Sequence, residues 1–310
     1  MKVVNNFLVV LIVCLIFLLV SSCVEDFDSA IGVSYMDIEG VPNILNNNPG
    51  PHSVGRLFEG YSLDELESLS KDFPDAMYLM ALVKFGNIPK MKVSPDPVAG
   101  RHLLEEAWRL GIVDAGYSLY EVYSKGVGVE VDNARAFSYL ESSAELGYIK
   151  SQQTLGFVLS GRRMNDFLEI DFSLARDWFE QAAKQGDAIS ALNLAGLYRA
   201  GKGGEADLAR AYYWASSAEN MRYGDAVYSF RTLAKYNEEG VGTDIDLVQA
   251  YKYYDLLSPG SAPDKTRLEA QMTPEQIREA IRLSRQWQEE HNIFVPSYYG
   301  LEYQEDGTFH

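Results

Sequence analysis

Small and bulky apolar residues alternate with polar ones in a fifteen-residue pattern that occurs five times along this chain. Each copy begins with an aspartate, has a small residue four positions later and a bulky residue three positions after that, and usually closes with a glycine. The copies begin at Asp96, Asp132, Asp171, Asp207 and Asp246. Successive aspartates lie 36 or 39 residues apart, which is the period of stacked supersecondary units that cannot bury their apolar faces alone.

The segment before each aspartate has the periodicity of a helix. Apolar residues recur every three or four positions, as at Ala115, Leu119 and Tyr123, and Gly126 follows the last of them. This spacing marks one face of a helix, and a glycine just past the end is a common left-handed C-cap. The pattern therefore predicts pairs of helices joined by a glycine turn. We expect Ala136, Ala175, Ala211 and Ala250 to face inward, and Trp178, Trp214 and Tyr139 to fill the gaps between pairs.

The turn between the two helices carries a recognisable motif. It reads Gly126-Val127-Gly128 with Asp132 and Ala136, then Gly240-Val241-Gly242 with Asp246 and Ala250, while Trp178, Ala182-Ala183 and Gly186 mark a second helix. Over roughly residues 75 to 260 the chain resembles the Sel-1-like repeat family, a relative of the tetratricopeptide repeat. The resemblance implies an all-α fold, a right-handed superhelical α-solenoid of helix-turn-helix units. It also implies a scaffold that recruits other proteins, with no enzymatic activity of its own.

Capping signals predict helices on both sides of the repeats. Ser62 and Glu65 form a capping box, and Thr273 begins a helix expected to end near Glu290. The second of these helices looks like the capping helix that often ends such arrays. We therefore expect four parts: a signal peptide of the lipoprotein type at 1–22, a tether at 23–60, repeats at 61–260, and a capping helix with a tyrosine-rich tail at 261–310.

The start of the chain has the layout of a secretory signal. Lys2 precedes an apolar run from Phe7 to Val20, which is shorter than the ~20 residues of a membrane span. The sequence Val20-Ser21-Ser22-Cys23 looks like a bacterial lipobox, so the resemblance implies cleavage before Cys23 and lipid on that residue. The alternatives are an uncleaved anchor or an ordinary signal peptide. Val24 after the cysteine favours an outer-membrane anchor facing the periplasm.

Cysteine usage and charge narrow the choice of partners. Removal of residues 1–22 leaves Cys23 as the sole cysteine, so no intramolecular disulfide can form. The formal net charge is −17, and no basic stripe is present to release counterions from a nucleic acid. This balance disfavours nucleic acid and fits either a cationic partner or simple solubility.

Motifs for catalysis, metals and cofactors are weak. Gly196 to Lys202 matches the spacing of a phosphate-binding loop, but Gly203 stands where that loop needs a hydroxyl, and the glycines belong to a helix and its cap. His102 near Glu105 reads as a solvated helix face. The four histidines are His52, His102, His291 and His310, and their scatter supports no zinc site. We therefore expect no catalytic residue, no metal and no cofactor.

Twenty tyrosines are the one compositional excess. Tyr212, Tyr213, Tyr251, Tyr253 and Tyr254 fall mostly at packing positions, which favours a place in the core, whereas exposed tyrosines could stack on a peptide or a sugar. The tail tyrosines either pack on the last unit or serve as a ligand.

Three functions follow as hypotheses. The first is a membrane-anchored, non-enzymatic scaffold that binds a protein or peptide in the groove of the solenoid, with the binding face unknown. The alternative is a factor that binds envelope polysaccharide or peptidoglycan. Exposure of Tyr299 and Tyr303 beside a groove would favour the alternative, and burial of both would remove its basis. An enzyme has no positive support.

Overall fold

The computed structural model describes residues 54, 56–86, 88, 91, 93–163 and 169–301. Cys23 and the predicted signal segment lie outside these residues. The regular elements of the described part are α-helices and two short 3-10 helices, with one isolated bridge between Asp187 and Tyr223 instead of a sheet. None of the helices in this part is both long and apolar enough to cross a bilayer.

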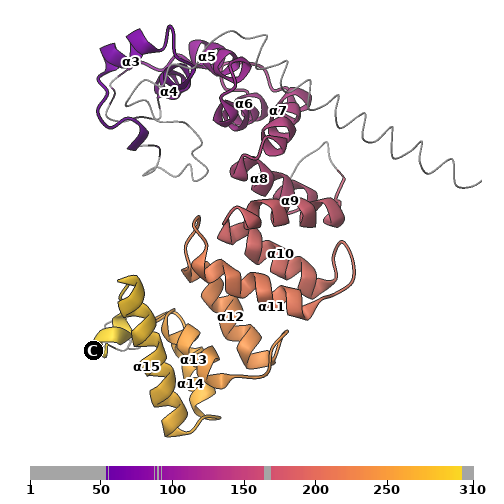
Figure 1. Ribbon diagram of the computed structural model, residues 1–310, viewed down its shortest axis with the longest axis vertical. Helices are drawn as coiled ribbons and strands as arrows, with labels where there is room; N and C mark the ends of the chain where they lie inside the picture. The colour runs from indigo at the N-terminus through magenta and orange to yellow at the C-terminus, as the bar shows by residue number, and fades with distance from the viewer. Residues whose placement is uncertain are drawn as a thin grey trace, which may run out of the picture. The chain divides into compact units, whose positions relative to one another are not determined.

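The helices follow one another in chain order (Figure 1). Their bounds are α3 Leu63–Leu69, α4 Pro74–Lys84, α5 Pro97–Arg109, α6 Val113–Lys125, α7 Asn133–Glu145, α8 Ile149–Leu159, α9 Phe172–Lys184, α10 Ala188–Ala200, α11 Leu208–Ser217, η1 Ala218–Asn220, α12 Val227–Glu239, α13 Leu247–Asp255, α14 Ala262–Glu269, α15 Pro274–His291 and η2 Pro296–Tyr299.

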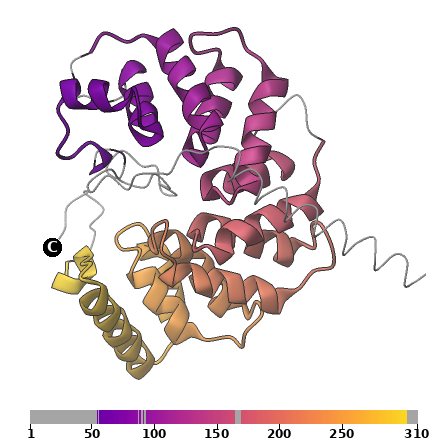
Figure 2. The ribbon, with the colours of Figure 1, turned by 45° about the horizontal axis from the view of Figure 1, so that its top comes forward.

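Five antiparallel pairs make up the repeats. Helix α4 packs on α5, α6 on α7, α8 on α9, α10 on α11 and α12 on α13, and each pair also packs on the next. Figure 2 shows the same succession from a second direction. The first helices of neighbouring pairs also meet, because α10 contacts both α8 and α12. The predicted all-α solenoid of helix-turn-helix units is confirmed.

The repeated aspartates cap the second helix of each pair. The carboxylates of Asp96, Asp132, Asp171, Asp207 and Asp246 accept hydrogen bonds from backbone N–H groups in the first turn of α5, α7, α9, α11 and α13. Their own backbone N–H groups donate to carbonyls near the end of the preceding helix, at Lys84, Tyr123, Leu159, Tyr198 and Asn237. Each aspartate thus starts one helix and ties it to the helix before, a role that the sequence pattern did not reveal.

Glycines close the first helices as predicted. Gly126, Gly201 and Gly240 are the C-cap residues of α6, α10 and α12, with φ of 69°, 63° and 70°. Gly161, two residues beyond the end of α8, has φ of 69°. A left-handed backbone at these positions satisfies carbonyls of the last turn, and glycine adopts it without a steric penalty.

The predicted packing residues lie in the core. Ala175, Ala211 and Ala250 are fully buried and Ala136 is 2% exposed, so backbones approach closely at these points. Trp178 packs against both hydrophobic clusters of the described residues. It therefore joins the apolar core of the earlier repeats to that of the later ones.

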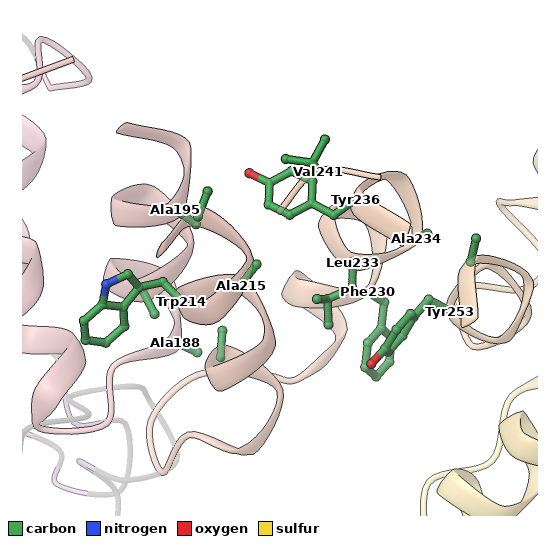
Figure 3. Close-up of a cluster of buried hydrophobic side chains, with 14 of the residues drawn as sticks. Ala188, Ala195, Trp214, Ala215, Phe230, Leu233, Ala234, Tyr236, Val241 and Tyr253 are labelled. Atoms are coloured by element: carbon green, nitrogen blue, oxygen red, sulfur yellow. The ribbon is translucent and has the colours of Figure 1, made fainter. Parts of the chain in front are cut away.

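Of the five tyrosines expected to lie mostly at packing positions, three are buried, Tyr212 is partly buried against the core and Tyr213 is exposed. Tyr251, Tyr253 and Tyr254 are buried, and the ring centres of Tyr253 and Phe230 lie 5.8 Å apart. Figure 3 shows these two rings next to each other. Tyr213, on α11, is 59% exposed. Its neighbour on the helix, Trp214, takes the buried position.

Both predicted end helices are present. A capping box of Ser62 and Glu65 starts α3, and Thr273 with Gln276 starts α15 in the same way. Helix α15 packs on α13 and ends at His291. It covers the last repeat, as expected of a capping helix.

A buried carboxylate holds this capping helix in place. Asp255, at the end of α13, is 2% exposed and accepts hydrogen bonds from Lys265 Nζ at 2.6 Å and Ser284 Oγ at 2.7 Å. Ser297 Oγ donates to the same carboxylate at 3.0 Å. One side chain therefore joins α13, α14, α15 and η2.

Candidate functional site

The candidate site is a hollow between the first helices of two adjacent repeats, which we call the α10–α12 groove. It has a volume of about 520 Å³. It is lined by Leu192, Asn193, Gly196 and Arg199 of α10, by Arg231, Thr232, Lys235 and Tyr236 of α12, and by Arg162 from the turn after α8.

Helix geometry explains why these residues share one surface. Leu192, Gly196 and Arg199 are spaced four and three residues apart, so they lie along one face of α10. Arg231 and Lys235 have the same relation on α12. The partly buried Leu192 and the buried ring of Tyr236 give the groove an apolar floor, and the exposed cations form its rim.

The lining is cationic although the whole chain is strongly acidic. Among the described lining residues four are Arg or Lys and none is a carboxylate, in a chain whose formal net charge is −17. Arg199 pairs with Glu239 at 2.8 Å, and the Nη1 of Arg231 lies 3.5 Å from Asp264. Within the described part of the chain, Arg162 and Lys235 have no ion pair.

Tyr236 contributes to the apolar floor of the groove. Its side chain is 3% exposed, and the guanidinium of Arg199 lies 5.3 Å from the centre of its ring. Burial raises the pKa of its hydroxyl, an effect that the nearby Arg199 charge partly offsets. The phenol is therefore neutral at physiological pH and available only as a hydrogen-bonding group.

Asn193 is held by its own helix. Its Nδ2 donates to the carbonyl of Ile189 at 2.7 Å, and its buried Oδ1 has no partner among the described residues. This back-bond fixes the amide at the side of the groove.

A second polar surface lies on α6 and the turn after α8, and its charged side chains pair with one another. Arg163 donates to Glu121 at 3.1 Å and lies 5.2 Å from the ring centre of Tyr120. Burial raises the pKa of Glu121, but the Lys125 and Arg163 charges outweigh it and leave that pKa below its usual value. Because its charges are already matched, this surface offers less to a ligand than the α10–α12 groove does.

The structure gives the glycine motif and His102 ordinary places on or beside helices. Gly196 to Lys202 covers the end of α10 and the turn after it, so no phosphate-binding loop is formed there. His102 is exposed, and its Nδ1 lies 3.5 Å from Glu105, as expected of a solvated helix face. The described part holds no cluster of His, Cys, Asp and Glu that could bind a metal ion.

The tyrosine-rich tail packs in part on α15. Tyr298 Oη donates to Glu289 at 3.0 Å, and the Tyr298 ring lies 4.7 Å from that of Phe294. Tyr299 is 65% exposed beside them. Tyr303 and Cys23 lie outside the described residues, so the tail prediction is answered only for its first two tyrosines.

Sequence reasoning missed the cations of the groove. They belong to three different segments, and single-chain periodicity reveals core positions rather than surface neighbours. The sequence places Arg199 and Lys235 toward the ends of two first helices, but nothing in it shows that their side chains share one surface.

Comparisons with known proteins agree with this architecture. The model of the Sel1 repeat matches residues 74–112, 108–148, 159–187, 188–222 and 233–257, which together exceed half of the chain. The solved structure of a Sel1 repeat protein from Oxalobacter formigenes aligns with a TM-score of 0.55 and 19% identity, and covers 76% of this chain and 96% of that one. Its likeness supports the fold alone.

Two further similarities cover less of the matched protein. A protective antigen of uropathogenic Escherichia coli with an SLR fold gives a TM-score of 0.45 at 17% identity, over 81% of this chain and 63% of that one. The chitin synthase regulator SKT5 of Saccharomyces cerevisiae is 28% identical over 194 residues, 60% of this chain, but the match spans only 27% of the yeast protein. On the evidence of the five matched repeats and the paired helices that they form, the chain belongs to the Sel1 repeat family.

Proposed function

We propose that this protein is a non-enzymatic scaffold that binds a protein or peptide in the α10–α12 groove while a lipid on Cys23 anchors it in the bacterial cell envelope. Sel1 repeat proteins generally act as protein-interaction scaffolds. The observation that carries the proposal is the groove itself, an open hollow with an apolar floor and a charged rim between two repeats. Stacked first helices offer such a surface to an extended partner.

The groove chemistry favours binding over turnover. Of the lining residues that the structure describes, only Thr232 and the phenol of Tyr236 carry a hydroxyl, and none carries a carboxylate or imidazole to act as a general base. Cations and an apolar floor can hold a ligand, but they provide no acid–base pair.

The anchor part of the proposal rests on the sequence. The run Val20-Ser21-Ser22-Cys23 resembles a lipobox, and Val24 favours an outer-membrane destination facing the periplasm. A Cys23→Ser variant should lose both labelling by radioactive palmitate and sedimentation with membranes. Retention of both in the variant would remove the anchor from the proposal.

Site-specific photocrosslinking tests the binding part. A benzophenone amino acid at Thr232, inside the groove, should crosslink to a reproducible protein partner in living cells. The same group at Tyr213, which is exposed on α11 and outside the groove, is the matched control. A partner captured equally well at both positions, or at Tyr213 alone, would contradict the groove as the binding site.

One observation supports the alternative, a factor that binds envelope polysaccharide or peptidoglycan. Tyr299 is 65% exposed and stands with Phe294 and Tyr298 in an aromatic cluster on which a sugar ring could stack. Binding of the full-length protein to peptidoglycan fragments that is lost in Tyr299→Ala would favour this alternative. Binding to glycans that is unaffected by Tyr299→Ala would remove its structural basis.

A further inference from the structure

The charge and shape of the α10–α12 groove specify its ligand more closely than the proposed function does. Resting on that function, we propose that the groove binds an acidic peptide segment of its partner, with one bulky apolar side chain seated over Gly196 and carboxylates on either side of it. Three independent features of the groove lead to this ligand: the open space at Gly196, the apolar floor and the unpaired cations.

Gly196 is the first feature, because nothing in the packing requires a glycine there. A Cβ on Gly116 would lie 2.5 Å from Trp108, and one on Gly156 would lie 2.5 Å from Phe179, so helix contact explains those two. A Cβ on Gly196 would meet no heavy atom within 4 Å. Glycine inside a helix costs about 1 kcal/mol relative to alanine, so neither packing nor helix propensity explains this residue.

The repeat register shows what Gly196 replaces. Each first helix has a carbonyl that accepts from the next aspartate N–H, and Gly196 lies two residues before that carbonyl. The residues in the same register in the other repeats are Leu82, Glu121, Phe157 and Lys235. Only in α10 is the side chain missing, and this leaves room in the groove for a side chain from elsewhere.

The floor around that room is apolar. Leu192 lies one turn before Gly196 on α10, and the buried ring of Tyr236 faces the groove from α12. From Leu192 to Arg199 the groove runs seven residues along a helix, or about 10 Å at 1.5 Å per residue. An extended peptide covers that length with about three residues, enough for one apolar side chain between two acidic ones.

The rim supplies the charge. Lys235 and Arg162 are exposed, and the described residues provide no carboxylate within salt-bridge distance of either. Since the chain as a whole carries −17, a cationic groove attracts an acidic segment locally while the rest of the surface repels long polyanions. A nucleic acid extends many phosphates beyond a site of this size, whereas a short peptide places its few charges on the rim.

A defined peptide tests the proposal. The probe is a short fluorescein-labelled peptide with glutamates on both sides of one leucine, added to full-length protein in detergent and followed by fluorescence anisotropy. We expect saturable binding that weakens as salt is raised, because exposed charges are screened. The same peptide with glutamine in place of glutamate should bind about tenfold more weakly, a loss of roughly 1.4 kcal/mol.

Two variants of the protein test whether the peptide binds in the α10–α12 groove. Lys235→Glu should weaken binding about tenfold, whereas Lys71→Glu, the same charge change at an exposed lysine between α3 and α4, should leave it unchanged. Gly196→Leu should abolish binding while the midpoint of thermal unfolding stays the same or rises, because leucine favours the helix and fills the open space. That combination separates a blocked groove from a protein that has failed to fold.

Three results would overturn the proposal. They are equal binding of the glutamate and glutamine peptides, equal losses in Lys235→Glu and Lys71→Glu, and tighter binding of a single-stranded oligonucleotide of similar length than of the peptide. The proposed function would survive any of them if the crosslinker at Thr232 still captured a partner and that at Tyr213 did not. The two ideas can therefore fail separately.

Discussion

Phe179 packs against the backbone of Gly156 so closely that a Cβ on residue 156 would lie 2.5 Å from its ring atom Cε1. Phe179 belongs to α9, the partner helix of α8, and is fully buried. The glycine therefore permits the contact that holds the third repeat together. Gly196, one repeat later, has no such contact.

This contrast predicts opposite effects of the same substitution. Gly156→Ala should lower the free energy of unfolding by about 1–3 kcal/mol, because the added methyl group overpacks the site. Gly196→Ala should raise it by about 0.4–1 kcal/mol, because alanine reduces the freedom of the unfolded chain without a clash. Urea unfolding followed by far-ultraviolet circular dichroism measures both, and shifts in the same direction would contradict the packing described here.

The aspartate caps should each contribute to stability. Asp246 accepts from the N–H of Gln249 at 3.0 Å at the start of α13, so Asp246→Ala should lower the free energy of unfolding by about 1 kcal/mol. Asp246→Asn should retain most of the stabilisation, since asparagine is also a good N-cap. Asp177→Ala, at an exposed aspartate inside α9, is the control and should have little effect. Equal losses in the alanine and asparagine variants would argue against a capping role.

Removal of Asp255 should release the capping helix. Asp255→Ala leaves the ammonium of Lys265 without its partner in a site where the lysine side chain is 17% exposed, and should cost about 3 kcal/mol. Hydrogen exchange should then accelerate in α15 more than in α6. A second substitution, Lys265→Met, should restore part of the loss because it removes the unpaired charge. Unchanged exchange in α15 would show that apolar packing alone holds that helix.

The ion pairs of Glu121 predict loss of stability in acid. Burial alone would raise its pKa, but Lys125 and Arg163 hold the pKa below the ordinary value of 4.5. The folded state therefore binds fewer protons than the unfolded state, so the contribution is complete above about pH 4.5 and is lost as the pH falls through the lowered pKa.

Thermal unfolding at several pH values checks this sign. The difference in midpoint between wild type and Glu121→Gln should be largest at neutral pH and should shrink in acid. Glu145→Gln, at an exposed carboxylate of α7, serves as the control. A difference that grows on acidification would mean that the folded protein disfavours the charged form of Glu121.

The sequence predicted the repeats because their core positions are periodic. Ala175, Ala211 and Ala250 occupy the same register and are buried for the same reason, so five copies of a pattern were enough to find the helix pairs. The pattern did not separate the exposed Tyr213 from the buried tyrosines, because adjacent tyrosines look alike in a sequence whereas their exposure depends on the helix face that each occupies.

The groove could not be predicted in this way, because it lies where the repeats differ from one another. Gly196 and Lys235 occupy the same register in neighbouring repeats. That they line one groove is evident only from the contact between α10 and α12. Arg162 comes from a turn that is longer than the others, so no register relates it to the rest. The sequence also did not predict that the buried Asp255 holds the capping helix, because its partners Lys265 and Ser284 lie on later helices outside the repeat pattern.

The central claim is that the α10–α12 groove holds a partner protein, and crosslinking from Thr232 in living cells tests it most directly. The account predicts that mass spectrometry will identify one reproducible partner, crosslinked within an acidic segment, and that Gly196→Leu will abolish the product without lowering the amount of folded protein. A crosslinked product that persists in Gly196→Leu, or one obtained only from Tyr213, would contradict the account.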